Sequence, residues 1–418
     1  MRTRTRVTAA AALALVIFAA ACESIFGPEA RPAPKKITEL PRELSAAEIG
    51  TLHASNAFGF ELLRRLHAED PAKTVFISPL SASMALGMTM NGANGETWEG
   101  MRTALQFGDL GQDEINASYR GLLDLLGDLD PAVTFEIGNS IWHRPGSEPL
   151  PAFRRTVESV FDAQIRGLDF ADPSAAATIN DWVRRVTRNR IRTIVDPPIP
   201  ANTITYLINA IYFKGNWTDR FDAQLTHSGP FHLPGGGTET VRFMDRTGEA
   251  LYHVTDRYMA AELAYGGQAF AMTIVVPTGD VAIADLIDRL ASGGWAELVE
   301  GLQPARIRVL LPRFELEWEA ALNNALMAMG MADAFSGSAD FSRMFPSGGQ
   351  ISEVKQKTFL EVDEEGTEAA AATSVGVVVC LCGPPEVRAD RPFILAIRER
   401  LSGTILFIGA IVEAPKSK

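Results

Sequence analysis

The most informative segment of the sequence runs from Glu364 to Pro385 and reads EEGTEAAAATSVGVVVCLCGPP. Residues 369–385 carry no charged side chain. Taken in alternation, one face of residues 367–379 holds only threonine, alanine and valine, which suits a half-buried strand. An exposed strand of this length and composition would be prone to aggregate at a sheet edge. The pattern therefore predicts either a central strand or a segment that is loop in one state and strand in another.

Further apolar runs predict strands on both sides of this stretch. They cover residues 204–213, 271–276, 307–311 and 358–362, and a C-terminal hairpin formed by 393–397 and 404–411. The run 204–213 is so continuously apolar that we expect it to be buried on both faces.

Helical patterns dominate the first part of the chain. Phe58, Leu62 and Leu66 recur every four residues, and Ser78-Pro79 places a capping hydroxyl before a proline at a helix start. Later helices are predicted over 284–290 and 322–331. Helices first, followed by mixed strands, predict an α+β protein with large sheets.

The first residues are typical of an export signal. Arg2, Arg4 and Arg6 precede an uncharged stretch over 7–21, which has the length of a signal-peptide core and is short for a membrane span. The small residues before Cys22 resemble the site at which bacterial lipoproteins are cleaved and acylated. We therefore predict an exported protein, anchored at the cell envelope (outer membrane or cell surface) by a lipid on Cys22. Plain secretion after cleavage of the signal is the alternative.

Three regions follow from this reading. Residues 1–21 are the predicted signal peptide, and residues 22–44 form a tether with four prolines and few large apolar side chains. Ser45 and Glu48 have the spacing of a capping box, so folding is expected to begin there. No second linker or repeat is visible, and residues 45–418 are predicted to form one domain.

Composition excludes several classes of function. The chain has 39 Lys and Arg against 51 Asp and Glu, a net charge of −12, which disfavours binding to nucleic acid. Three cysteines are too few for a disulfide framework, and six histidines leave little room for a metal centre. There is no G-x-S-x-G, H-E-x-x-H or phosphate-loop motif, so we expect neither an enzyme nor a cofactor.

Four separated motifs resemble the serpin family of serine protease inhibitors, in the family's order and across about 370 residues. They are FISPLS at 76–81, NAIYFKG at 209–215, EGTEAAAA at 365–372 and DRPFILAI at 390–397. The resemblance implies the serpin fold, with three β-sheets, about nine helices and an exposed reactive-centre loop at about 364–387.

It also implies a suicide-substrate mechanism, in which a protease cleaves the loop and the cut loop inserts into the central sheet. By the resemblance, the hinge of that loop is formed by Glu364, Gly366, Thr367, Glu368, Ala369, Ala370, Ala371 and Ala372. Insertion requires small or apolar side chains on the buried face and no proline before the cut. Residues 367–379 meet both demands, which favours an inhibitor over a non-inhibitory serpin that acts as a binding module.

The family's spacing from Gly366 places the cleaved bond after Cys380, before Leu381. A small, weakly polar residue behind three valines suits an elastase-like or chymotrypsin-like serine protease. A cut after Leu381 would favour a chymotrypsin- or subtilisin-like target, and a cysteine protease is a further alternative. No Lys or Arg lies between Thr367 and Pro385, which disfavours a trypsin-like target. We expect the inhibitor to be a monomer.

The resemblance implies supporting roles for six further residues. Ser78, Ser81, Asn209 and Gln356 would lie beneath the central sheet where its strands part, while Trp217 and Arg313 would lie at the end where insertion begins. The family commonly has a histidine at the position of Gln356, so pH sensitivity from that histidine should be absent. Arg313 is expected to pair with Glu364.

The arginine cluster and the cysteine pair each allow two interpretations. Arg184, Arg185, Arg188, Arg190 and Arg192 crowd a predicted helix end, as a solvated face or as a polyanion site. Cys380 and Cys382 are free thiols in an exposed loop, or else a redox-sensitive pair.

Overall fold

The computed structural model describes residues 34–201, 203–366 and 383–416. Several sequence-based predictions lie outside the described residues. These are the lipidation site Cys22, the hinge residues Thr367–Ala372, the cleavage site Cys380–Leu381 and Cys382. From Pro34 onward the described chain is one compact unit.

The longest helix, α1 (Ala46–Glu69), begins with the predicted capping box. The Ser45 hydroxyl accepts the Glu48 N–H at 3.2 Å, and the Glu48 carboxylate accepts the Ser45 N–H at 2.8 Å. Helix α2 (Pro79–Met90) begins at the predicted cap Ser78 and is buried along almost its whole length. The other helices are α3 (Gly95–Ala104), α4 (Gln112–Gly127), α5 (Pro151–Phe161), α6 (Ala175–Val186), α7 (Ile283–Arg289), α8 (Trp295–Gly301) and α9 (Asn323–Leu326).

The largest sheet has nine strands in the order β1-β14-β13-β8-β7-β6-β9-β12, with β5 paired to β6. Its strands are β1 (Val75–Ile77), β5 (His227–His232), β6 (Thr238–Val254), β7 (Tyr258–Tyr265), β8 (Phe270–Pro277), β9 (Gln303–Pro312), β12 (Glu386–Arg388), β13 (Phe393–Glu399) and β14 (Ile405–Ile411). Strands β13 and β14 form the predicted C-terminal hairpin. Every residue of β8, β13 and β14 is buried, so these strands form the centre of the core.

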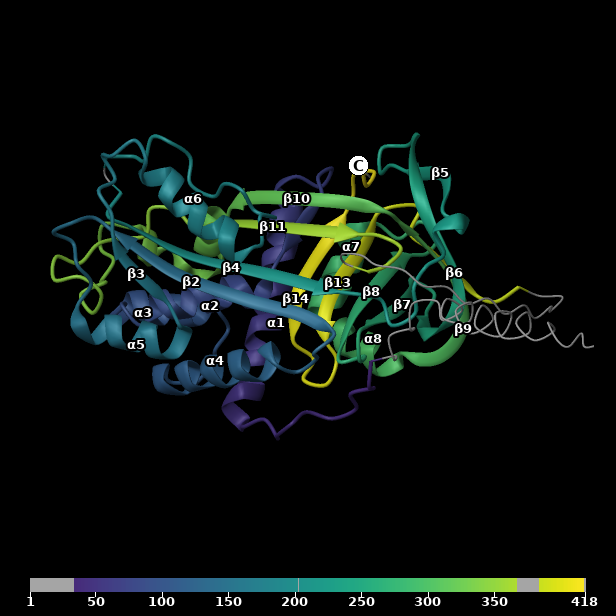
Figure 1. Ribbon diagram of the computed structural model, residues 1–418, viewed down its shortest axis with the longest axis horizontal. Coiled ribbons are helices and arrows are strands. Elements are labelled where there is room, and N and C mark those ends of the chain that lie inside the picture. Colours follow the sequence, from purple (N-terminus) through teal and green to yellow (C-terminus); the bar gives the residue numbers. More distant parts are fainter. Residues whose placement is uncertain (1–33, 202, 367–382, 417–418) are drawn as a thin grey trace, which may run out of the picture. The chain divides into compact units, whose positions relative to one another are not determined.

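Two smaller sheets lie next to each other (Figure 1). One has the order β3-β2-β4, from β3 (Gln164–Gly167), β2 (Val133–His143) and β4 (Thr205–Gly215); the other pairs β10 (Phe314–Ala321) with β11 (Lys355–Val362). Among the described residues, β4 pairs with β2 and β11 with β10, but β4 and β11 do not pair along their length. The two strands therefore belong to separate sheets, which we call the β4 half and the β11 half.

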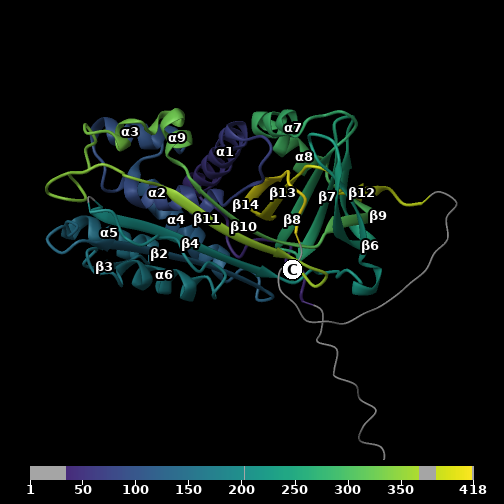
Figure 2. The same ribbon diagram turned by 90° about the horizontal axis from the view of Figure 1, so that it is seen from above.

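Helices cover the two faces of the β4 half differently. Helix α2 contacts β4 and β14, on what we call the inner face. Helix α6 covers the opposite, outer face, where Ile179 and Trp182 pack with Trp142 of β2 and Ile208 of β4. Figure 2 shows α6 and the three-stranded sheet on one side of the unit and α1, α3 and α7 on the other.

The predicted α+β fold with three β-sheets is confirmed in the described residues. Two details were wrong. Residues 205–207 of β4 are only half-buried, because one side of the strand lines a cavity. The helix predicted over 322–331 is regular only in α9, since Gly330 has φ +114°, outside the helical range. No helix in the described ranges is long and apolar enough to span a bilayer.

Candidate functional site

A cavity of about 830 Å³ separates the first residues of β4 from the first residues of β11. Residues 205–209 line it from β4, residues 354–356 from the start of β11, and Ser81 and Ala85 from α2 on the inner side. The site that the sequence predicts for parting strands therefore lies at a real opening between the two small sheets.

The first turn of α2 contacts both strands that flank this cavity. Gln356 of β11 accepts the Ser78 N–H at 3.1 Å and donates Nε2 to the Ser78 carbonyl at 2.9 Å. On the other side, the Ser81 hydroxyl donates to Oδ1 of Asn209 on β4. Asn209 in turn donates to Oδ1 of Asn139 on β2 at 2.7 Å. The four residues predicted beneath the sheet are thus brought together by one helix end.

At the other end of the two strands, the backbone joins them directly. The Trp217 N–H, just after β4, donates to the Glu365 carbonyl at 2.9 Å, and its indole Nε1 donates to the Asp363 carbonyl at 2.9 Å. The Trp217 side chain is buried and stacks on Tyr265, with 4.4 Å between the ring centroids. The start of the predicted hinge is therefore fixed against β4 by a rigid aromatic pair.

Glu364 is held by two partners at this end. Nη1 of Arg313 contacts its Oε2 at 2.7 Å, and the Thr226 hydroxyl donates to its Oε1 at 2.7 Å. The Glu364 side chain is 7% exposed and that of Arg313 is 40% exposed, so the carboxylate is the buried member of the predicted pair. Burial also raises the pKa of the neighbouring Glu365, whose Oε2 has no hydrogen-bond partner among the described residues.

Gly366 is required where it stands. Its φ is +142°, and a Cβ added there would lie 2.3 Å from the carbonyl oxygen of Gly215 and 2.5 Å from Cα of Asn216. Gly366 and Asp363 also form an antiparallel bridge, so the chain turns back beside β11 at this point. Any larger residue would push the hinge away from β4.

The arginine cluster at the end of α6 is largely neutralised. Arg184 pairs with Asp181, Arg188 with Glu136, and Arg190 with Glu361. The hydrogen bond to Glu136 raises the pKa of Arg188, which stays charged. With three of its five cations paired to carboxylates, the cluster is a poor polyanion site.

Sequence reasoning missed several residues of the site. Asn139, Thr226 and Tyr265 each support a predicted residue, and Thr358 donates its hydroxyl to the Phe76 carbonyl at 2.7 Å from the inner face of β11. Asn139, Tyr265 and Thr358 lie in strands and Thr226 lies just before β5, and none of these positions carries a distinguishing sequence signal. Only the partner across the fold shows what each one does.

Comparison with known proteins gives a consistent picture. A family model described as Serpin (serine protease inhibitor) matches residues 53–414. The human leukocyte elastase inhibitor is 33% identical over 373 residues, which cover 85% of this chain and 97% of that protein. Intracellular coagulation inhibitor 2 of Tachypleus tridentatus is also 33% identical over 373 residues, covering 86% and 90%.

Solved structures agree. The native state of tengpin, a thermophilic serpin, superposes with a TM-score of 0.80 at 29% identity and covers 92% of this chain and 98% of that one. Because the family model and these relatives are described as inhibitors and not as catalysts, the prediction that the chain is not an enzyme is confirmed. The match over most of the chain shows that the protein belongs to the serpin family of serine protease inhibitors.

Proposed function

We propose that this protein inhibits a serine protease as a suicide substrate. The protease serine Oγ attacks the carbonyl carbon of Cys380, and the bond to the Leu381 nitrogen breaks, with the amine taking the proton. The resulting ester links Cys380 to the protease. The cut strand then inserts between β4 and β11 and carries the protease with it. The observation that most supports this proposal is the cavity between these two strands, which do not pair with each other along their length.

The register at the hinge supports the same proposal. If the antiparallel bridge between Asp363 and Gly366 continued, Thr367 would face Val362 and Glu368 would face Glu361. Val362 is fully buried on the inner face of β11, whereas Glu361 is on the outer face. Every second residue from Thr367 to Val379, which is threonine, alanine or valine, would thus point inward, and Glu368 would point outward.

An elastase-like protease is the proposed target, with a chymotrypsin-like one second. Cys380 behind three valines fits a shallow apolar primary pocket, and the similarity to the leukocyte elastase inhibitor supports this class. If the cut falls after Leu381 instead, a chymotrypsin- or subtilisin-like protease is expected. A cysteine protease would form a thioester in place of the ester.

The test is incubation with a panel of serine proteases, followed by denaturing electrophoresis and mapping of the cut. We expect a denaturant-stable complex and a new N-terminus at Leu381. Thr367→Arg should convert the protein into a substrate that is cleaved without a complex, because a charge would enter the buried face. Glu368→Arg is the matched control: it places the same side chain one position later, facing outward, and should still form the complex.

Cleavage without a complex by every protease would instead support a non-inhibitory serpin that acts as a binding module. In that case Thr367→Arg and the unchanged protein would behave alike. The unfolding temperature after cleavage separates this outcome from a panel that lacks the right protease, since only an inserting loop gains stability that Thr367→Arg abolishes and Glu368→Arg preserves.

We further propose that the protein is exported and anchored by a lipid on Cys22. The three arginines, the uncharged stretch 7–21 and the small residues before Cys22 support this reading. Cys22→Ser should move the protein from the membrane fraction to the soluble fraction, whereas Cys382→Ser should leave it in place. Equal membrane partitioning of Cys22→Ser and the unchanged protein would contradict the anchor.

A further inference from the structure

The segment that follows α6 makes a tight turn over the outer face of β4. The Asn189 N–H donates to the Arg184 carbonyl at 2.7 Å, and the Thr187 hydroxyl accepts the Ile191 N–H at 3.1 Å. Arg188 and Asn189 both have positive φ, +49° and +65°. This turn, residues 187–191, presents two arginine side chains in different directions.

Arg188 is held by the β4 half. Its guanidinium pairs with Glu136 of β2 at 2.5 Å and lies 5.2 Å from the ring centroid of Tyr212 on β4. Both partners belong to the three-stranded sheet. These two contacts hold the turn on that sheet.

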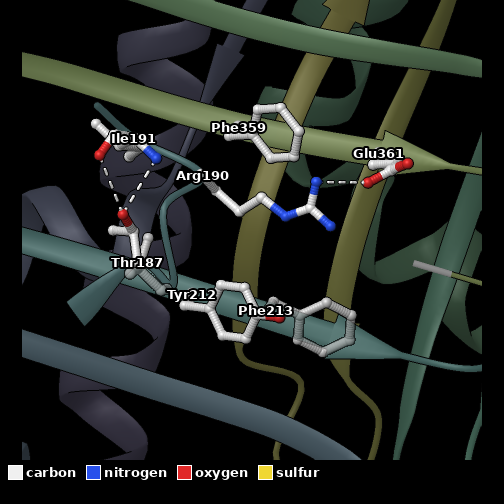
Figure 3. A pocket seen from close by; sticks show the side chains of 8 residues that line it. Thr187, Arg190, Ile191, Tyr212, Phe213, Phe359 and Glu361 are labelled. Atoms are coloured by element: carbon white, nitrogen blue, oxygen red, sulfur yellow. Dashed lines mark hydrogen bonds and ion pairs between the residues drawn. The ribbon is translucent and has the colours of Figure 1, made fainter. Parts of the chain in front are cut away.

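Arg190 reaches across to the other half. Its guanidinium pairs with Glu361 at 2.9 Å and lies 5.2 Å from the ring centroid of Phe359, and both of these partners are on β11. The same side chain lines a small hollow together with Tyr212 and Phe213 of β4 (Figure 3). Arg190 therefore fills the space between the two strands from the outer side.

The Arg190 pair is also better shielded than that of Arg188. The Arg190 and Glu361 side chains are 25% and 22% exposed, against 50% and 45% for Arg188 and Glu136. A shielded ion pair is less screened by solvent, and an arginine over an aromatic face adds a cation–π attraction. Each of the two arginines lies 5.2 Å from an aromatic ring, so what distinguishes Arg190 is the shielding of its ion pair and the fact that this pair reaches β11.

We propose that Arg190 is a positioning residue that latches β11 to the α6 layer and so limits the insertion of any strand between β4 and β11. The proposal rests on the proposed function, because it concerns the same opening. A strand that inserts there separates β11 from β4, and Arg190 then loses either Glu361 and Phe359 or its place beside Tyr212. Removing the latch lowers the barrier to insertion without altering the residues that line the cavity.

The test measures insertion without a protease. An acetylated synthetic peptide with the sequence of residues 367–379 is incubated with the mature full-length protein, and its incorporation is followed by native electrophoresis. Arg190→Ala should incorporate the peptide about five- to tenfold faster than the unchanged protein, given the usual strength of a shielded pair with a cation–π contact. Arg188→Ala, which removes the same side chain from the same turn, should change the rate less than about twofold.

Two further variants establish the mechanism. Glu361→Gln should accelerate incorporation in the same way, and Arg190→Ala combined with Glu361→Gln should be no faster than Arg190→Ala alone. Hydrogen exchange of the β11 amides should rise in Arg190→Ala and not in Arg188→Ala. Urea unfolding of each variant shows whether a general loss of stability accounts for the rates.

Three results would each overturn the latch. The first is an equal rise in the incorporation rate in Arg188→Ala and Arg190→Ala. The others are additive effects in the double variant and no peptide incorporation by any variant. The result does not depend on protease inhibition. If no protease forms a complex but Arg190→Ala takes up the peptide faster, the proposed function fails and the latch stands.

Discussion

Gln356 and Ser78 lie 278 residues apart in the chain and exchange two buried hydrogen bonds, one in each direction. A glutamine amide both donates and accepts and does not titrate, so this contact is the same at every physiological pH. It ties β11 to the first turn of α2 at the edge of the cavity. The consequence is that the strands are held together beneath the sheet by a group that acid does not release.

Gln356→Leu should destabilise the protein by about 1–3 kcal/mol, because it leaves the buried Ser78 N–H and carbonyl without a partner. Gln356→His should instead make stability depend on pH. A histidine charged below about pH 6.5 cannot accept the Ser78 N–H, so stability would fall with acidification. Urea unfolding at pH 7.5 and 5.5 measures both effects. Gln350→Leu, at an exposed position, is the control and should change neither.

Glu364→Lys should be the most damaging change at the hinge. It would place a cation in a site that is 7% exposed and holds the Arg313 guanidinium. Glu364→Gln keeps the shape and should lose only about 1.5–3 kcal/mol, the usual contribution of a hydrogen bond to a charged group. We expect Glu364→Lys to lose more than this and to form oligomers on native electrophoresis. Glu239→Lys, on the exposed side of β6, should remain monomeric and stable; similar behaviour of the two lysine variants would show that Glu364 is not special.

His67 should make the protein less stable in acid. It is buried in α1, neither ring nitrogen has a hydrogen-bond partner among the described residues, and burial lowers its pKa below the ordinary 6.5. Between the lowered pKa and 6.5 the unfolded chain binds more protons than the folded chain. Stability is therefore lost as pH falls through this window, by up to about 1.4 kcal/mol per pH unit, and is unaffected above it.

His67→Leu should remove this part of the pH dependence. The comparison is the difference in urea midpoint between pH 7.5 and pH 5, measured for His67→Leu and for the control His53→Leu on the exposed side of the same helix. A slope that is the same in both variants would mean that other groups dominate acid unfolding.

Cleavage in the loop should raise the thermal unfolding temperature if the cut strand inserts. Each new backbone hydrogen bond to β4 and β11 contributes about 0.5–1.5 kcal/mol, so a strand bonded on both sides adds several kcal/mol. Calorimetry before and after limited proteolysis measures the gain. Thr367→Arg should abolish most of it and Glu368→Arg should preserve it; an unchanged unfolding temperature after cleavage would argue against insertion.

Much of the architecture follows from local pattern. The capping box at Ser45, the serine cap of α2 and the C-terminal hairpin were predicted from short spacings, because their physical causes are local. Strand β6 was not predicted, since its 17 residues are mostly polar and alternate in exposure without an apolar run. It is stabilised by β5, β7 and β9, which are remote features of the fold.

Some residues of the candidate site could likewise be predicted from sequence motifs, and others could not. Gly366 and Glu364 could be found from the hinge motif, and Trp217 and Asn209 from the motif that includes β4. Arg190 could not, because its partner Glu361 is 171 residues away and the pattern around it is only a run of arginines. A charged cluster read from sequence suggests a solvated surface, and only the fold shows which cation crosses between two strands.

The first turn of α2 has a mechanical consequence. Ser78 is hydrogen-bonded to β11 and Ser81 to β4. Among the described residues, the first residues of β4 and β11 do not pair with each other. The two small sheets are therefore both attached to one helix end. They can move apart by rotating about that helix end, while each sheet keeps its own hydrogen bonds to the helix. Widening the opening between the first residues of β4 and β11 then breaks few hydrogen bonds, which is what a fold that admits a new strand there requires.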